Sequence, residues 1–384
     1  MKLSVAPFPN ARHLLLPALI LAVASCSASE PLEQPLSDEA MAAVAEDAGA
    51  PRDNVARQVD DLFSQESLGE TRALVVIANG KLAAERYAQG YDADTRFVSW
   101  SMAKTVSAML IGMLVADGRL SVEEPAPVSL WQRPGDPRGA ITLKHLLQMR
   151  SGLRHTEAGD PPYESSEVRM LFLDGRDNMA QWAKEQPLEA EPGEQFEYSS
   201  NTSVILADIA ARALTQSDDP ETRRTAVANY LQARLFEPLG MTSMVPEFDA
   251  SGTLIGGSLM HASARDWAKL GELLRRKGRA PTGEQLVPAK WVEAMVTQSP
   301  VSAHYGYQTW LNREFREPAS DQPHPLFPER APQTVFALIG HMGQYVIVSP
   351  SQRVTIVRLG HSNPEERIAL LQELADILAL YPEI

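Results

Sequence analysis

The chain has 384 residues, of which 44% are hydrophobic and 22% are charged, and its formal net charge is −14. This length supports a sizeable core, in about two domains or in one two-lobed domain. The acidic surplus, together with the lack of a basic patch with interleaved aromatic residues, argues against nucleic acid or an anionic membrane surface as a charge-bound partner.

Residues 1–25 are predicted to be a signal peptide. Basic residues precede the apolar run LLLPALILAVAS, which at about a dozen residues is too short to span a bilayer as a helix. The run ends in Val23-Ala24-Ser25-Cys26, which resembles the lipobox of bacterial lipoproteins. That resemblance implies cleavage before Cys26 and lipidation of its side chain. The alternative is an ordinary secretory signal with an incidental cysteine.

Cys26 is the only cysteine of the chain, so no intramolecular disulfide can form. Ser27, where an aspartate would favour retention at the inner membrane, favours sorting to the outer membrane. We therefore expect a lipid-anchored protein at the periplasmic face of the outer membrane, with the lipid as its only membrane contact. Residues 26–38 are polar, contain proline and are expected to form the lipidated tether.

The globular part is expected to span residues 39–384. Residues 39–66 have a helical pattern with a break near Pro51. ALVVIA (73–78) and LAAERYA (82–88) flank Asn79-Gly80, a pair that suits a two-residue hairpin turn.

Ser101 and Lys104 follow this hairpin at the start of an apolar helical segment. Residues three apart share one face of a helix, so the amine can reach the hydroxyl. Ser101 could instead be a helix cap with a nearby surface lysine. A lysine at the end of a buried helix is uncommon without a partner, and this favours a functional pair.

The middle of the chain is rich in loops and helices. Helices are expected over ITLKHLLQM (141–149), with Thr142 as a cap, over NTSVILADIAARAL (201–214), and after Ser263. Asp266 follows Ser263 in a capping pattern, so a structural role is expected for it.

Strands are expected again near the C-terminus, over residues 334–340, 344–348 and 354–359, before a last helix over 367–381. Strands at both ends of the chain predict an α+β fold: an antiparallel sheet flanked by helices, with an inserted, mainly helical lobe. The sheet lobe is expected over about 39–99 and 252–384, and the helical lobe over about 100–251.

The order of these segments resembles that of the serine β-lactamase-like hydrolases, which include class C β-lactamases, DD-peptidases, family VIII esterases and 6-aminohexanoate-dimer hydrolases. The resemblance covers about residues 70–381. It lies in SMAK (101–104), ITLKHLLQMRSGL (141–153), FEYSSNTSVILADI (196–209), GGSLMHASARDWAKLGELL (256–274), YGYQTW (305–310) and GHMGQYVIVSPSQRVTIVRL (340–359). It implies the β-lactamase/transpeptidase-like fold and an acyl-enzyme on Ser101.

A serine hydroxyl needs a base near neutral pH. The resemblance offers Lys104, if its pKa is lowered, or Tyr198, if its phenolate is stabilised, and both roles stay open. It also implies that the backbone N–H groups of Ser101 and Gln344 form the oxyanion hole.

The chain departs from the β-lactamase pattern at two places. Ser200 replaces the asparagine of Tyr-x-Asn, although Asn201 is an alternative for that role. His341-Met342-Gly343 replaces Lys-Thr-Gly, and we expect Ser200, His341 and Gly343 to contact substrate. An uncharged histidine and a methionine are poor ligands for a β-lactam carboxylate. A hydrogen-bonded strand histidine is the alternative for His341.

The sequence therefore favours an esterase or amidase. Its rivals are a DD-peptidase or β-lactamase and a non-catalytic envelope binding protein. No metal-ligand spacing is present among the histidines, so neither a metal nor another cofactor is expected. His145 is expected to be packed, and Tyr163 is a candidate lid residue that would touch substrate.

Overall fold

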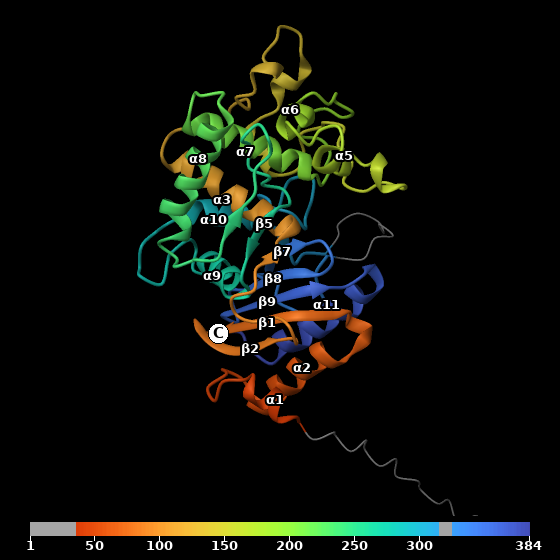
Figure 1. Cartoon of the computed structure of the whole chain (residues 1–384), viewed down its shortest axis with the longest axis vertical. Helices are drawn as coiled ribbons and strands as arrows, with labels where there is room; N and C mark the ends of the chain where they lie inside the picture. Colours follow the sequence, from red (N-terminus) through yellow and green to blue (C-terminus); the bar gives the residue numbers. More distant parts are fainter. Residues whose placement is uncertain (1–35, 315–324) are drawn as a thin grey trace, which may run out of the picture. The chain divides into compact units, whose positions relative to one another are not determined.

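The structure, a computed structural model, describes residues 36–314 and 325–384, and residues 36–384 form one compact unit. Within the described residues, one antiparallel sheet contains six strands in the order β2-β1-β9-β8-β7-β6 (Figure 1). Their bounds are β1 Glu70–Ala78, β2 Lys81–Tyr87, β6 Trp310–Leu311, β7 Phe336–Gly340, β8 Gln344–Ser349 and β9 Val354–His361. The two ends of the described unit thus share one sheet, as predicted.

A second, smaller sheet has the order β3-β5-β4. Its strands are β3 Phe97–Val98, β4 Val245–Pro246 and β5 Met260–Ala262. Phe97 pairs with Ala262, so the chain just before Ser101 is fixed against a segment that lies far away in the sequence.

The helices fall into an N-terminal pair, a long central group and a C-terminal helix. Their bounds are α1 Asp38–Ala42, α2 Arg52–Ser64, α3 Ala103–Ala116, α4 Leu143–Leu147, α5 Ser166–Phe172, α6 Met179–Lys184, α7 Ser200–Leu214, α8 Pro220–Leu231, α9 Ala264–Arg275, α10 Ala289–Met295 and α11 Pro364–Ala379. Short turns of 3₁₀ helix include η1 Glu66–Leu68, η2 Trp100–Met102 and η5 Pro162–Glu164. None of the helices within the described ranges is long and apolar enough to cross a membrane.

Strand β1 separates two hydrophobic cores because successive side chains of a strand point to opposite faces. Leu74 and Val76 pack with residues of α2 and α11, whereas Ala73 and Val75 pack with residues of α3 and α9. Figure 1 shows α2 and α11 beside the large sheet, and α3 with α5–α8 gathered above it in this view, away from β1 and β2. The sheet is therefore covered by helices on both faces.

The predicted hairpin is confirmed: Asn79 and Gly80 connect β1 to β2 with φ angles of 53° and 79°. Glycine adopts such a positive φ without the steric cost that a Cβ would add. Helix α2 starts after Pro51, at the predicted break. Helix α1 starts at Asp38, the last residue of the predicted tether, but it ends at Ala42, so the helical prediction is wrong for residues 43–51.

Helices α4 and α11 differ from the prediction at their boundaries. Helix α4 is shorter than expected, although Thr142 caps it as predicted, by accepting a hydrogen bond from the N–H of His145. Helix α11 begins three residues before the predicted start. The side chain of Asn363 accepts from the N–H of Glu366, whose carboxylate in turn accepts from the N–H of Asn363. This capping box moves the start of the helix toward the N-terminus.

Candidate functional site

Ser101 and Lys104 lie where the structure turns from the small sheet into the central helices. Ser101 belongs to η2, and α3 begins two residues later, at Ala103. The Nζ atom of Lys104 lies 2.7 Å from Ser101 Oγ and donates to it. Ser101 is partly exposed, whereas Lys104 is 1% exposed. The cap alternative for Ser101 is wrong, because the N-cap of α3 is Met102 and the side chain of Ser101 accepts from a buried lysine.

The ammonium group of Lys104 has a full set of acceptors. Besides Ser101, it donates to Ser200 Oγ at 2.8 Å and to the carbonyl oxygen of Gly257 at 2.9 Å. A lysine ammonium has three N–H donors, so these partners fix its orientation. Glu157 Oε1 lies at 3.5 Å and adds electrostatic attraction.

Tyr198 lies two residues before α7 and faces the same ammonium. Lys104 Nζ lies 4.7 Å from the centroid of the Tyr198 ring, within the range of a cation–π interaction. Burial raises the pKa of Tyr198, and this outweighs the Lys104 charge and the hydrogen bonds with Ser101 and Lys104, which lower it. Tyr198 is therefore a neutral phenol at neutral pH.

Lys104 is correspondingly held in its charged form. Burial lowers the pKa of Lys104, but the interactions with Tyr198, Glu157 and Glu167 outweigh it, and the net pKa is raised. The lowered pKa that would make Lys104 a ready base is therefore not found. In the resting site the lysine carries its proton, and so does the phenol.

Ser200, rather than Asn201, is the residue of the YSSN segment that joins the cluster. Ser200 is fully buried and contacts Lys104. Asn201 points to α5, where its side-chain amide donates to the carbonyl of Ser166 at 3.3 Å and contacts the sulfur of Met170. The alternative role considered for Asn201 is therefore wrong.

Two carboxyl groups that the sequence analysis did not single out complete the cluster. Glu157 accepts from the Oγ of Ser200 and from its backbone N–H, each at 2.6 Å. Glu167, in the first turn of α5, lies with Oε1 3.1 Å from Ser200 Oγ. Burial and the charge of Glu157 raise the pKa of Glu167 to about 7. Both lie in a loop-rich, acidic segment, where no spacing distinguishes them from surface glutamates.

The turn formed by His341, Met342 and Gly343, here called the HMG turn, lies beside the same site. The rings of His341 and Trp100 make an edge contact with their centroids 5.5 Å apart, and both β7 and β8 contact η2. Partial burial, followed by the charges of Arg367 and His361, lowers the pKa of His341, so this ring is neutral at neutral pH. The turn thus lies next to Ser101 without adding positive charge.

Gln344 and Gly343 hold the backbone of this turn. The side-chain amide of Gln344 donates to the carbonyls of His341, Met342 and Gly360, and its oxygen accepts from the N–H of Gly360. Gly343 has a φ of 82°, and its carbonyl accepts from the buried Arg358. The sequence analysis assigned Gln344 only a backbone role and missed this side-chain network.

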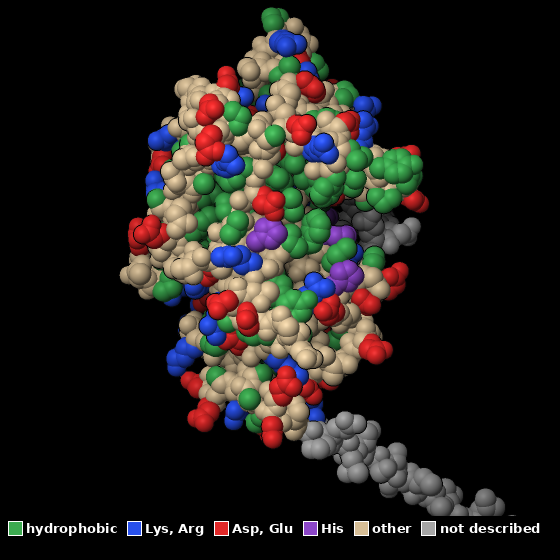
Figure 2. All heavy atoms as spheres, in the orientation of Figure 1, with side chains coloured by type: hydrophobic (Ala, Val, Ile, Leu, Met, Phe, Trp, Pro, Cys, Tyr) green, Lys and Arg blue, Asp and Glu red, His purple; other side chains and the backbone are tan. Residues whose placement is uncertain are grey.

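An aromatic cluster lies on the Tyr198 side of the site. The ring of Tyr198 lies 5.0 Å from that of Trp310 and 5.8 Å from that of Tyr305, centroid to centroid. Phe196 and His304 extend this cluster. On the face drawn in Figure 2, hydrophobic and histidine side chains lie together in the central part of the unit. Trp100, the residue before Ser101, adds a further aromatic ring beside the nucleophile.

The remaining candidates do not join the cluster. Tyr163 is 62% exposed on η5. His145 takes part in the cap of α4, as expected of a packed residue, and Asp266 binds Ser243 and Lys269 in a structural role. Across the described ranges, no group of three or more His, Cys, Asp or Glu could hold a metal ion. Cys26 and most of the predicted tether lie outside the described residues.

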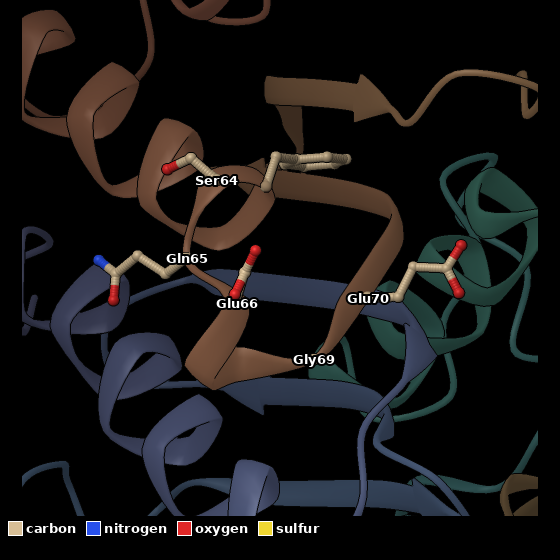
Figure 3. Close-up of a pocket in the computed structure, with 6 residues that line it drawn as sticks. Ser64, Gln65, Glu66, Gly69 and Glu70 are labelled. Atoms are coloured by element: carbon tan, nitrogen blue, oxygen red, sulfur yellow. The ribbon is translucent and has the colours of Figure 1, made fainter.

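A separate cavity of about 350 Å³ lies between α2 and β1 (Figure 3). The residues that line it are Phe63, Ser64, Gln65, Glu66, Gly69 and Glu70. None of them belongs to the Ser101 cluster, so this cavity plays no part in the site described above.

The β-lactamase family matches residues 70–380 of the chain. The chain belongs to the β-lactamase family. This family also accounts for the fold, in which an antiparallel sheet built from both chain ends is flanked by helices.

Relatives of the chain include two hydrolases. The chain is 24% identical over 259 residues to the 6-aminohexanoate-dimer hydrolase of Paenarthrobacter ureafaciens, across 64% of this chain and 62% of that protein. It is 29% identical over 212 residues to the esterase EstB of Burkholderia gladioli, across 49% of this chain and 50% of that protein. The matched part therefore spans less than two thirds of either relative.

Solved structures of β-lactamase-family proteins share the fold. A β-lactamase from Mycobacterium bovis aligns with a TM-score of 0.58 at 19% identity, over 84% of this chain and 98% of the other. A penicillin-binding protein homologue from Caulobacter crescentus aligns with a TM-score of 0.58 at 16% identity, over 87% of this chain and 98% of the other.

Proposed function

We propose that this protein is a serine hydrolase that cleaves an ester or amide through an acyl-enzyme on Ser101. The observation that carries the proposal is the 2.7 Å contact between the partly exposed hydroxyl of Ser101 and the buried ammonium of Lys104. A buried lysine that is held by further partners beside an accessible hydroxyl is placed to act as its base once the lysine has given up a proton.

In the proposed reaction, Ser101 Oγ forms a bond to the substrate carbonyl carbon while its proton moves to Lys104 or Tyr198, once that group has given up its own proton. The carbonyl oxygen gains the electron pair of the broken π bond, and the backbone N–H groups of Ser101 and Gln344 donate to it. The intermediate then collapses, and the leaving group takes a proton from the Lys104–Tyr198 pair. Water hydrolyses the acyl-enzyme in a second cycle of the same steps.

The surroundings of Ser101 favour neutral substrates. His341, Gly343 and Ser200 are the proposed substrate contacts, and the lowered pKa of His341 leaves that ring uncharged at neutral pH. An uncharged ring gives little attraction to a β-lactam carboxylate, whereas the flanking aromatic rings suit apolar acyl or leaving groups. An ester or amide with apolar substituents is therefore the preferred substrate class.

A substrate panel tests this function. Wild type and Ser101→Ala are assayed with p-nitrophenyl butyrate, an anilide amide, a D-Ala-D-Ala peptide and nitrocefin, and intact mass is recorded after fluorophosphonate treatment. We expect ester turnover and a single adduct in wild type, and neither in Ser101→Ala. Retention of most activity by Ser101→Ala would exclude Ser101 as the nucleophile.

The same panel distinguishes the rival functions. The likeness to a penicillin-binding protein homologue gives weight to a DD-peptidase or β-lactamase. Faster turnover of nitrocefin or of the D-Ala-D-Ala peptide than of esters would support this rival. A folded wild type that neither turns over any substrate nor becomes acylated would instead be a non-catalytic binding protein.

We also propose that Cys26 is lipidated and anchors the protein at the periplasmic face of the outer membrane. The lipobox-like sequence before Cys26 supports this anchoring. Palmitate labelling of wild type and Cys26→Ala in a bacterial host tests it. We expect label only in wild type, and equal incorporation into both would rule lipidation out.

A further inference from the structure

The resting site leaves open how Lys104 becomes a base. The pKa of Lys104 is raised and Tyr198 is a neutral phenol, so Lys104 cannot take the Ser101 proton until it has lost a proton of its own. The hydrogen bonds around Ser200 supply a route for this proton.

Ser200 Oγ lies between one donor and two carboxyl groups. It accepts from Lys104 Nζ at 2.8 Å, and Glu157 Oε1 and Glu167 Oε1 lie at 2.6 Å and 3.1 Å. A hydroxyl has one proton, so it can donate to only one of the two carboxyl groups. The shorter distance and the second bond from the Ser200 N–H identify Glu157 as the acceptor of the Ser200 hydroxyl proton. Because the Ser200 proton is then directed at Glu157, the contact between Ser200 Oγ and Glu167 is a hydrogen bond only if Glu167 is protonated and donates to the hydroxyl oxygen.

We propose that Glu157 and Glu167 form a proton-holding carboxyl pair that takes a proton from Lys104 through Ser200 and thereby converts Lys104 into the base for Ser101. Lys104 gives one N–H proton to Ser200 Oγ, and the hydroxyl proton of Ser200 moves to Glu157 Oε1. The neutral amine then takes the Ser101 proton as Ser101 Oγ bonds to the carbonyl carbon. Both glutamates act through Lys104 and are positioning residues. This inference rests on the proposed hydrolase function.

The pair suits this role because two close carboxylates resist ionising together. The negative charge of one carboxylate raises the proton affinity of the other. The pKa of Glu167, about 7, has this cause together with burial. The fully ionised pair is therefore the better proton acceptor, and acylation is expected to rise with pH through the range around 7.

Other titratable groups also face the pair. Those that interact electrostatically with Glu157 or Glu167 are Lys104 on α3, Tyr198 and Glu197 before α7, Tyr305 before β6, and His341 after β7. The pKa values of Lys104, Tyr198 and Tyr305 are all raised, and that of His341 is lowered. Burial raises the pKa of Glu197, so this carboxyl has to be distinguished from Glu167 by mutation.

Titration of the carboxyl groups tests the pair independently of any activity. Wild type, Glu157→Gln and Glu167→Gln are labelled with ¹³C at the glutamate carboxyl carbon and followed by NMR from pH 4 to 9. We expect a resonance with a midpoint near pH 7 that is missing in Glu167→Gln, beside that of Glu373, whose pKa burial also raises to about 7 and which stays in every variant. In Glu157→Gln this midpoint moves at least one pH unit down. The absence of such a resonance, or an unmoved midpoint in Glu157→Gln, would overturn the pair.

The pH dependence of kcat/KM for p-nitrophenyl butyrate tests the transfer step. In Glu167→Gln we expect the acid limb to move down by at least one pH unit and the plateau to fall about tenfold, because a lone carboxylate is a weaker acceptor. Glu157→Gln is expected to lose about 100-fold, with partial rescue in Glu157→Asp. The exposed Glu164→Gln, in η5 between the two glutamates, is the matched control and keeps the wild-type profile.

The outcomes separate this inference from the hydrolase proposal. If wild type turns over esters and needs Ser101, but Glu167→Gln keeps the wild-type acid limb, the carboxyl pair is excluded and the hydrolase stands. If wild type turns over nothing, the hydrolase proposal fails, and the NMR titration still decides whether the pair shares a proton.

Discussion

The ammonium of Lys104 lies 4.7 Å from the centre of the Tyr198 ring, so one buried cation faces both the π face of that ring and the hydroxyl of Ser101. The ring and the phenol oxygen make separate contributions to this contact. Phenylalanine keeps the π face but removes the hydroxyl.

Tyr198→Phe therefore tests the phenol alone. We expect kcat for p-nitrophenyl butyrate to fall about 100-fold, the magnitude typical of a lost general acid or base, while the melting temperature changes little. Tyr91→Phe, in a half-buried tyrosine outside the site, is the control. If Tyr198→Phe stays within threefold of wild type, the phenol has no part in proton transfer and Lys104 is the only base.

Ser200 and Ser203 form a matched pair on α7. Both are fully buried and hydrogen-bonded, but Ser203 donates to Gln308 at 2.6 Å, whereas Ser200 contacts Lys104. Each alanine variant should cost roughly 1–3 kcal/mol of unfolding free energy, because a buried partner is left unsatisfied. Only Ser200→Ala should also lose activity, by about tenfold or more. Equal activity in the two variants, measured alongside urea unfolding, would refute a role for Ser200 in the site.

Gln344 is expected to support activity through the backbone of the HMG turn. Gln344→Ala removes the hydrogen bonds that its side chain makes to this turn and to Gly360. Gln352→Ala is the control, because that side chain holds carbonyls of Leu378 and Tyr381 at the C-terminal end. Both variants should lose stability by about 1–3 kcal/mol. A fall in kcat/KM is expected only for Gln344→Ala, and an unchanged value would show that the turn keeps its shape without the amide.

Asp208 is expected to make the fold sensitive to acid. Burial raises the pKa of Asp208, but Lys184, Arg212 and Arg223 outweigh it, so the pKa of the folded protein lies below the ordinary value. The ionised carboxylate therefore stabilises the fold above an unfolded pKa of about 3.9, and this contribution is lost as the pH falls through the lower folded pKa.

Asp208→Asn removes this contribution and leaves buried cations without their anion. We expect a loss of about 3–5 kcal/mol at pH 7 and a shallower decline in stability below pH 4, measured by urea unfolding at several pH values. The exposed Asp218→Asn serves as the control. Parallel stability–pH curves for wild type and Asp208→Asn would contradict this account.

The sequence predicts the fold well because its signals are local. The Asn79-Gly80 turn and the β-branched runs near the C-terminus specify the hairpin and the strands without reference to the rest of the chain. The contact of Ser101 with Lys104 follows from helical spacing in the same way. The start of α11 was missed because the capping box of Asn363 and Glu366 adds a turn before the apolar pattern begins.

The missing parts of the site depend on tertiary contacts. Glu157 and Glu167 are ordinary acidic loop and helix residues until the fold brings both to Ser200. The side chain of Gln344 acts on a turn that becomes defined only when β8 pairs with β7 and β9. The contacts of Glu157, Glu167 and the Gln344 side chain produce no periodic pattern in the sequence, so they become visible only in the three-dimensional structure.

The pairing of β1 with β9 also has a consequence for biosynthesis. The ribosome synthesises Glu70 long before Val354, so the edge of β1 that pairs with β9 stays unpaired until almost the whole chain has been made. Pairing across so great a sequence separation is slow, and an open strand edge can associate with other chains in the meantime. We therefore expect the newly synthesised chain to need a chaperone that covers this edge until β9 has been made.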